Sequence, residues 1–197
     1  MSEFDRLDWD KQAGLVPAIV QDARTLRVLM LGWMNREALA MTQASGWVTF
    51  YSRSRGALWT KGETSGHRLQ CVSLSVDCDA DTLLVSALPQ GPTCHLGRDS
   101  CFPGAPGNGL AELDAVVDHR MRERPAGSYT ARLLDEGPLR IAQKVGEEGV
   151  EVALAGAARD DAALLGEAAD LVYHLIVLLR ARGLGLSDLE TTLASRR

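Results

Sequence analysis

The strongest constraint on the fold of this chain is a change of hydrophobic period on either side of the segment PGAPGNG, residues 103–109. Proline and glycine concentrated in this way break both helices and strands, as a linker does. Before the segment, apolar residues form short runs typical of strands; after it, they recur every three or four positions, as in amphipathic helices. We therefore expect two domains, at residues 1–105 and 110–197, in this chain of 197 residues.

The first half has the pattern of a β-rich α+β domain. Its strand-like segments are LVPAIVQ, LRVLMLGW, WVTFYS, RLQCVSLSVD and TLLVSALP. One helix is expected among them, from Asn35 to about Ser45. Asn35 suits the N-cap, Glu37 lies in the first turn, and Gly46 follows the last residue.

The second half has the pattern of an all-α helical bundle. Its segments with helical spacing are LAELDAVVDHRMRER, SYTARLLDEG, PLRIAQKVGEEGVEVALAGAA, DAALLGEAADLVYHLIVLLRARG and LSDLETTLAS. Pro138 opens the third segment, and a proline is tolerated there because the first turn of a helix does not need its N–H.

Charge and segment lengths exclude several classes of protein. A formal net charge of −5 argues against a nucleic-acid binder that relies on a broad basic field. The N-terminus MSEFDRLDWDKQ has neither the basic nor the apolar region of a signal peptide. The apolar stretch DLVYHLIVLLRARG is shorter than the roughly 20 residues of a membrane span. We expect a cytoplasmic protein that binds neither nucleic acid nor a membrane.

Three aspartates lie at every second position of the stretch DCDAD, residues 77–81. On a strand, alternate side chains point to opposite faces, so Asp77, Asp79 and Asp81 would line one face and Cys78 the other. The ordinary alternative is a solvated strand face that ends in an Asp-rich turn, because Asp forms turns readily and strands poorly.

The cysteines suggest a metal site. In a cytosolic chain, clustered cysteines point to metal binding or catalysis more often than to disulfides. Thiolates suit Zn²⁺, and a catalytic zinc has three protein ligands, which Cys78, Cys94 and Cys101 can supply. The spacing is not C-x-x-C, so ordinary buried cysteines remain an alternative.

The segment YSRSRGALWTKGETSGHRLQ combines cations with small residues, as a phosphate site requires. The candidate phosphate-binding residues are Arg53, Arg55, Lys61 and His67. A flexible, charged loop is the ordinary alternative. Trp59 in the middle of the segment weakens this alternative, because an exposed aromatic side chain is costly unless it packs or stacks.

Four motifs of the first half resemble, in order and spacing, the phosphoribosyl-AMP cyclohydrolase of histidine biosynthesis. These motifs are MLGWMNREAL, YSRSRGALWTKGETSGH, VDCDADTLLV and TCHLGRDSCF, and the resemblance covers residues 15–103. It implies hydrolytic opening of the adenine ring between N1 and C6. It also implies that Mg²⁺ is bound by Asp77, Asp79 and Asp81, and Zn²⁺ by Cys78, Cys94 and Cys101.

Zinc chemistry agrees with this resemblance, because a zinc-bound water has a pKa of about 7 and can act as the nucleophile. His95, next to Cys94, is our preferred proton shuttle; His67 is the alternative, and a structural role is open for both. Because Cys78 would face away from the aspartates, we expect its zinc to be completed by another subunit. The resemblance likewise implies a homodimer with shared ligands. Cys71 lies outside the implied ligand set and is expected in the core.

Two carboxylate pairs occur in the second half, Glu148-x-x-Glu151 and Glu167-x-x-Asp170. Residues three or four apart share a helix face. Isolated pairs of this kind are usually solvated. Here they lie among Val, Ala and Leu, where an unpaired carboxylate is expensive.

Two glycines and a lysine accompany these acids. Gly146 and Gly149 cost about 1 kcal/mol each inside a helix, and several local rules broken together suggest a functional site. Four carboxylates in a bundle suit Mg²⁺ that holds a polyphosphate, and Lys144 lies where it can meet the pyrophosphate. His174, one turn after Asp170, is expected to be a buried structural histidine.

The second half resembles phosphoribosyl-ATP pyrophosphohydrolase, a relative of the all-α nucleotide pyrophosphohydrolases. The resemblance rests on SYTARLLDEG, RIAQKVGEEGVEVALA and EAADLVYHLIVLL and covers residues 110–197. Together the halves imply an enzyme that removes pyrophosphate from phosphoribosyl-ATP in its second domain and opens the ring of the product, with zinc-activated water, in its first. The competing hypothesis is a non-catalytic nucleotide or metal sensor, against which the retention of every candidate ligand argues.

Overall fold

A computed structural model describes residues 3–158 and 160–196. The chain divides into two compact units, Met1–Asn108 and Gly109–Arg197, and the boundary lies inside the expected linker. The first unit contains all the strands of the described residues and the second unit contains only helices. The predicted combination of a β-rich α+β domain and an all-α domain is therefore confirmed.

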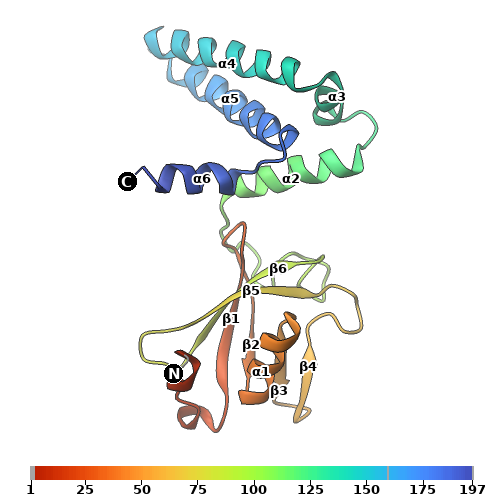
Figure 1. The fold of residues 1–197 in the computed structure, drawn as a ribbon, viewed down its shortest axis with the longest axis vertical. Helices are drawn as coiled ribbons and strands as arrows, with labels where there is room; N and C mark the ends of the chain where they lie inside the picture. The colour runs from red at the N-terminus through yellow and green to blue at the C-terminus, as the bar shows by residue number, and fades with distance from the viewer. Residues whose placement is uncertain (1–2, 159, 197) are drawn as a thin grey trace. The chain divides into compact units, whose positions relative to one another are not determined.

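The first unit is built on a four-stranded sheet in the order β2-β1-β6-β5 (Figure 1). Strand β1 pairs antiparallel with β2 and parallel with β6, and β6 pairs antiparallel with β5. A second sheet consists of β3 and β4. The strands are β1 (Val16–Asp22), β2 (Val28–Met34), β3 (Thr49–Ser52), β4 (Ala57–Thr60), β5 (Leu69–Val76) and β6 (Leu83–Pro89). Five of the six coincide with the predicted segments within two residues at each end. Strand β4 was not predicted, because its residues lie inside the polar, glycine-rich segment YSRSRGALWTKGETSGHRLQ.

Helix α1 (Arg36–Ser45) begins and ends as the sequence predicts. The Asn35 side chain accepts a hydrogen bond of 2.8 Å from the N–H of Ala38, which caps the N-terminus. Gly46 has a φ of 74°, the left-handed conformation that ends many helices. Two short 3-10 helices, Glu3–Arg6 and Asp10–Gln12, precede β1.

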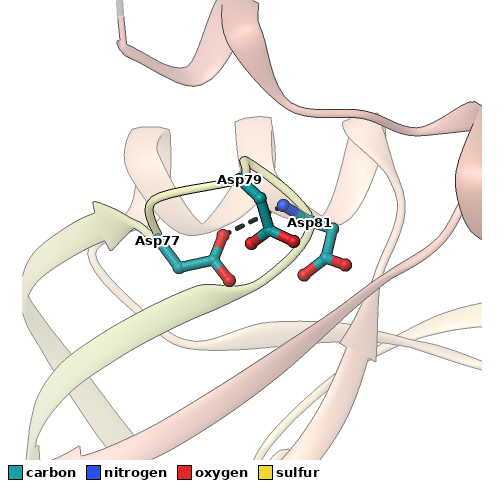
Figure 2. A group of neighbouring side chains, drawn as sticks. All are labelled: Asp77, Asp79 and Asp81. Atoms are coloured by element: carbon teal, nitrogen blue, oxygen red, sulfur yellow. Dashed lines mark hydrogen bonds between the residues drawn. The ribbon is translucent and has the colours of Figure 1, made fainter.

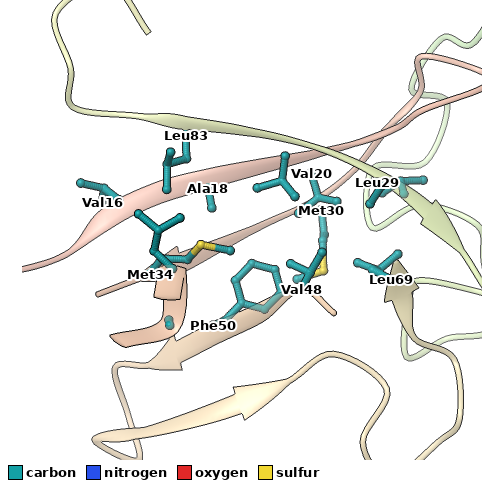
Figure 3. Close-up of a cluster of buried hydrophobic side chains, with 14 of the residues drawn as sticks. Val16, Ala18, Val20, Leu29, Met30, Met34, Val48, Phe50, Leu69 and Leu83 are labelled. Carbon is teal, nitrogen blue, oxygen red and sulfur yellow. The ribbon is translucent and has the colours of Figure 1, made fainter. Parts of the chain in front are cut away.

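The core of the first unit lies between the two sheets and α1 (Figure 3). Every second residue of β1 is buried, which is the pattern of a strand with one face in the core. Phe50 of β3 packs directly against the backbone of Gly32 in β2, where an added Cβ would lie 2.3 Å from the ring. This close contact fixes β3, and with it the loop after β4, against the main sheet.

The second unit contains α2 (Gly109–Glu123), α3 (Tyr129–Glu136), α4 (Pro138–Ala158), α5 (Asp161–Ala181) and α6 (Leu186–Ala194). These bounds agree with the predicted segments within two residues at each end. Helices α4 and α5 pack against each other along their length (Figure 1). The buried core of the second unit consists of Val117, Leu133, Ile141, Ile176 and Val177.

Helix α5 corrects one expectation. The sequence suggested an apolar run too short for a membrane, but α5 has 21 residues and is long and apolar enough by length and composition. The difference arises because the helix extends back through an alanine- and leucine-rich stretch to Asp161. Only 17% of this apolar window is buried within the described residues. Helix α5 also carries two acidic residues, Glu167 and Asp170.

A buried ion pair joins three helices of the second unit. Asp114 of α2 accepts a hydrogen bond of 2.6 Å from Nε of Arg180 in α5, and one of 3.3 Å from the N–H of Leu186 in α6. Asp114 itself is buried. The pair therefore links α2 to the end of α5 and the start of α6.

We expect Asp114→Ala to destabilise the second unit by about 3 kcal/mol, because removing one partner of a buried pair leaves the other charge uncompensated. Urea unfolding followed by circular dichroism measures the change. Asp118→Ala is the matched control, because Asp118 lies 3.8 Å from the same guanidinium and is less buried. Its cost should stay near about 0.5 kcal/mol. Equal losses in the two variants would show that the burial of Asp114 does not matter.

Candidate active sites

The three aspartates lie in the turn that joins β5 to β6 (Figure 2). Strand β5 ends at Val76, so the predicted strand alternation through residues 77–81 is wrong. The Asp77 carboxylate accepts the N–H groups of Asp81 (2.9 Å) and Thr82 (3.0 Å), and Ala80 has a φ of 61°. Such side-chain-to-backbone bonds compete with strand pairing and favour a turn.

This turn brings the three carboxylates together. One oxygen from each of Asp77, Asp79 and Asp81 lies within 4.8 Å of the others. Three carboxylates form a hard, anionic set of donors that fits a divalent cation such as Mg²⁺. The grouping that the sequence suggested is therefore present, although a turn produces it.

A cation that sequence reasoning missed lies on this cluster. The ammonium of Lys11, from the 3-10 helix Asp10–Gln12, donates to Asp81 and, at 3.4 Å, to Asp79. The hydrogen bond from Lys11, followed by that from Thr82, lowers the pKa of Asp81. No local sequence pattern predicts this contact, because 68 residues separate Lys11 from Asp79.

Cys94 and Cys101 lie in the loop after β6. Hydrogen bonds attach this loop to β2. The N–H of Cys101 donates to the carbonyl of Leu29 (2.8 Å), and the Ser100 hydroxyl donates to that of Val28 (2.7 Å). Burial, and then the neighbouring Cys94, raise the pKa of the Cys101 thiol. The two cysteines are thus held side by side in a fixed loop, as two ligands of one metal would be.

A cavity of about 600 Å³ opens beside these cysteines. The segment after β4 and the loop after β6 supply most of its lining. Its polar lining residues include Arg55, Lys61, His67, Thr93, Cys94, His95 and Cys101, together with Thr60, Glu63, Thr64 and Ser65. The Thr93 hydroxyl is buried without a hydrogen-bond partner among the described residues. The structure therefore collects both candidate histidines and two of the candidate cations around the cysteine pair.

Arg53 lies apart from this set. Its guanidinium stacks 4.5 Å above the ring of Trp33 and lines a neighbouring cavity of about 560 Å³. Trp59 lines both cavities. The cations that the sequence places in one segment are thus divided between two hollows, because β3 and β4 form a hairpin that separates Arg53 from Lys61.

Cys78 does not join the other two cysteines within one chain. It is exposed in the same turn as the aspartates, whereas Cys94 is buried and Cys101 lies beside it. Among the described residues, the groups of side chains close enough to share an ion are the three aspartates and a set of three glutamates. One chain therefore contributes two cysteines to one place and a third elsewhere.

The three glutamates lie between α4 and α5 of the second unit. Oxygens of Glu148, Glu151 and Glu167 lie within 4.8 Å of one another. Asp170 is outside this group, although the sequence grouped it with the other three. A hydrogen bond to the Glu148 carboxylate, and then the nearby charge of Glu167, raise the pKa of Glu151, as expected for carboxylates that face one another. This donor set also fits a hard divalent cation.

Lys144 lies one turn before these acids on α4. Its ammonium is 2.8 Å from Glu148 and 2.9 Å from Glu147. This contact lowers the pKa of Glu148, which is buried. An added Cβ at Gly146 or Gly149 would meet nothing within 4 Å, so packing inside the chain does not explain the two glycines.

His174 is buried, as the sequence predicts. Its Nδ1 lies 2.8 Å from the backbone carbonyl of Asp170, and its Nε2 lies 3.0 Å from the Tyr129 hydroxyl. Both ring nitrogens therefore have partners within the unit, which is the arrangement of a structural histidine.

Comparison with known proteins covers both units. Residues 30–103 match the family model described as phosphoribosyl-AMP cyclohydrolase, and residues 110–197 match that of phosphoribosyl-ATP pyrophosphohydrolase. The chain is 68% identical over 190 residues to the histidine biosynthesis bifunctional protein HisIE of Xanthomonas axonopodis pv. citri, which covers 96% of this chain and 92% of the relative. It is 53% identical over 199 residues to the HisIE protein of Shewanella oneidensis, with 99% and 93% covered.

These similarities extend over both units and nearly the whole length of the relatives. They agree with the geometry, in which an N-terminal cavity with paired cysteines and a C-terminal carboxylate cluster form separate sites. The chain therefore belongs to the family of bifunctional histidine-biosynthesis enzymes, with a cyclohydrolase region followed by a pyrophosphohydrolase region.

Proposed function

We propose that the domain at residues 110–197 removes pyrophosphate from phosphoribosyl-ATP, and that the domain at residues 1–105 then opens the adenine ring of the phosphoribosyl-AMP product. The substrates are small-molecule nucleotides, and the reactions run in the reverse of chain order. Neither nucleic acid nor a membrane takes part. We place the protein in the cytoplasm.

The convergence of Glu148, Glu151 and Glu167 carries the proposal for the first reaction. These acids, with Asp170 one turn along α5 from Glu167, would hold Mg²⁺. The bound ion would neutralise charge on the polyphosphate. Lys144, already at the edge of the cluster, would then bind the pyrophosphate oxygens.

The cavity beside Cys94 and Cys101 carries the proposal for ring opening. A zinc held by these thiolates would supply a water with a pKa of about 7. His95 is the preferred group to move the proton, and His67 on the same cavity is the alternative. Lys61 and Arg55 would bind the substrate phosphate in this cavity, and Arg53 would bind it from the neighbouring one.

The separation of Cys78 from the other cysteines supports a zinc shared between two subunits of a homodimer. Cys78 is exposed, so a partner's cysteine pair can reach it. In the same turn, Asp77, Asp79 and Asp81 would hold Mg²⁺. The helical unit also leaves large apolar side chains exposed on α4 and α5, among them Leu139, Leu154 and Leu165. A second copy would cover such a surface.

Mixing two inactive variants tests the shared site. A dimer of one Cys78→Ala chain and one Cys94→Ala chain keeps one intact site out of two. Random exchange makes half the dimers mixed, so ring opening should return to about a quarter of the wild-type rate. The matched control mixes Cys94→Ala with Cys101→Ala, which leaves no intact site in any dimer. Recovery in neither mixture would refute sharing, as would full activity of Cys78→Ala alone.

A further inference from the structure

Lys11 is held against the aspartate turn by the backbone around it. The N–H of Asp8 donates to the carbonyl of Ala80 at 2.7 Å, which joins the N-terminal segment to the turn itself. Trp9 is buried in the core of the same unit, and the N–H of Gly14 closes the segment onto its carbonyl at 2.7 Å. The lysine therefore stays beside the cluster whatever its own ammonium binds.

The ammonium of Lys11 lies against two of the three carboxylates that would hold a metal ion. Its ammonium contacts Asp79 and Asp81, two of the three aspartates that lie side by side in the turn (Figure 2). Mg²⁺ binds carboxylate oxygens at about 2.0–2.1 Å in a strict octahedral arrangement. The same oxygens cannot hold both cations in this geometry, so one must leave when the other binds.

The choice of lysine at this position is unusual in this chain. The chain has three lysines, Lys11, Lys61 and Lys144, among 21 basic residues. Two of the three lie on the two carboxylate clusters. Ion pairs elsewhere commonly use arginine, for example Arg122 with Asp118 and Arg124 with Asp135.

Lysine and arginine differ in how they hold a carboxylate. Lysine carries a compact point charge on a flexible stem, whereas arginine grips carboxylates through a planar, two-pronged contact. A lysine is therefore the basic residue that a metal ion displaces more readily.

We propose that Lys11 is an internal counter-ion of the aspartate cluster: without metal it offsets part of the negative charge of Asp79 and Asp81, and Mg²⁺ displaces it on binding. This inference rests on the proposed role of Asp77, Asp79 and Asp81 as Mg²⁺ ligands. Lys11 then sets the affinity of the site and, once displaced, is a free cation beside it. Lys11 is thus a positioning residue that acts through the cluster.

Calorimetric titration with MgCl₂ measures this competition without any turnover. All chains should carry Glu151→Ala, which removes the second carboxylate cluster as a binding site. Lys11→Met should then bind Mg²⁺ about fivefold to tenfold more tightly, since a unit charge within about 4 Å contributes about 1 kcal/mol in water. Lys11→Arg should bind it more weakly than wild type, because a two-pronged contact is harder to displace.

Amine labelling supplies a second readout in the full wild-type chain. Acetylation of Lys11, read by peptide mass spectrometry, should speed up several-fold when Mg²⁺ is added. Lys61 is the internal control, because its ammonium lies near the carbonyl of His67 at 3.5 Å. Its labelling should not change with Mg²⁺.

Asp79→Asn separates the two ways of failing. Suppose that Asp79→Asn weakens Mg²⁺ binding, yet Lys11→Met binds no more tightly and the labelling of Lys11 does not change. The counter-ion role is then overturned while the Mg²⁺ site stands. If the Glu151→Ala chain binds no Mg²⁺, or Asp79→Asn does not weaken the binding, the proposed site itself fails, and the role of Lys11 fails with it.

Discussion

Replacing Cys94 with alanine is expected to lower the rate of ring opening by more than about a hundredfold, because loss of even an outer partner of a metal ligand costs about 10–100-fold. Cys94 is buried next to Cys101 in a loop that is bonded to β2. Cys101, the one cysteine left of the pair, cannot complete a zinc site that needs three ligands. Pyrophosphate release should stay close to wild type, since Cys94 and the glutamate cluster belong to separate units.

The absorbance change on ring opening of phosphoribosyl-AMP measures this loss, and zinc per subunit should fall with it. Cys71→Ala is the matched control: Cys71 is a half-buried cysteine of the same unit that packs against the core. It should keep both its zinc and its activity. A Cys94→Ala chain that still opens the ring at the wild-type rate would exclude the paired cysteines as the catalytic site.

Glu151→Gln should impair pyrophosphate release and leave ring opening intact. The Glu151 carboxylate faces Glu148 and Glu167, and the hydrogen bond to Glu148 and the charge of Glu167 raise its pKa. The amide removes one anionic ligand with almost no change in size. We expect pyrophosphate release to fall by more than about a hundredfold, while phosphoribosyl-AMP supplied directly is still opened.

Glu147→Gln is the control for this variant. Glu147 lies on the same helix and contacts the same Lys144, but it is outside the carboxylate group. Release of pyrophosphate, measured by a coupled phosphate assay, should fall much less in Glu147→Gln than in Glu151→Gln. Equal losses in the two variants would mean that the glutamates of α4 act through their net charge and that Glu151 is not a specific ligand.

Local patterns were enough to predict most of the fold. The Asn35 cap, the Gly46 end of α1 and Pro138 at the start of α4 are set by short-range hydrogen bonds and backbone preferences. The helix pattern of the second half follows from side-chain burial at a fixed period. The sequence motifs likewise predicted that Cys94 lies near Cys101 and that Glu148 lies near Glu151.

Long-range contacts explain what could not be predicted. A strand was expected through Asp77, but the structure has a turn there. The reason is that the Asp77 carboxylate accepts hydrogen bonds from the backbone N–H groups of Asp81 and Thr82. Lys11 contacts this turn from 68 and 70 residues away, which no periodicity reveals. Arg53 is separated from Lys61 by the pairing of β3 with β4, and Phe50 of β3 packs on Gly32 of β2.

The most direct test of the central claim is a two-stage assay on the wild-type chain with phosphoribosyl-ATP as the only nucleotide. With Mg²⁺ alone, after removal of zinc, pyrophosphate and phosphoribosyl-AMP should accumulate with no absorbance change. Adding Zn²⁺ should then produce the absorbance change of ring opening. Formation of neither product would contradict the account and leave a non-catalytic metal or nucleotide sensor, whereas ring opening before any pyrophosphate release would contradict the proposed order.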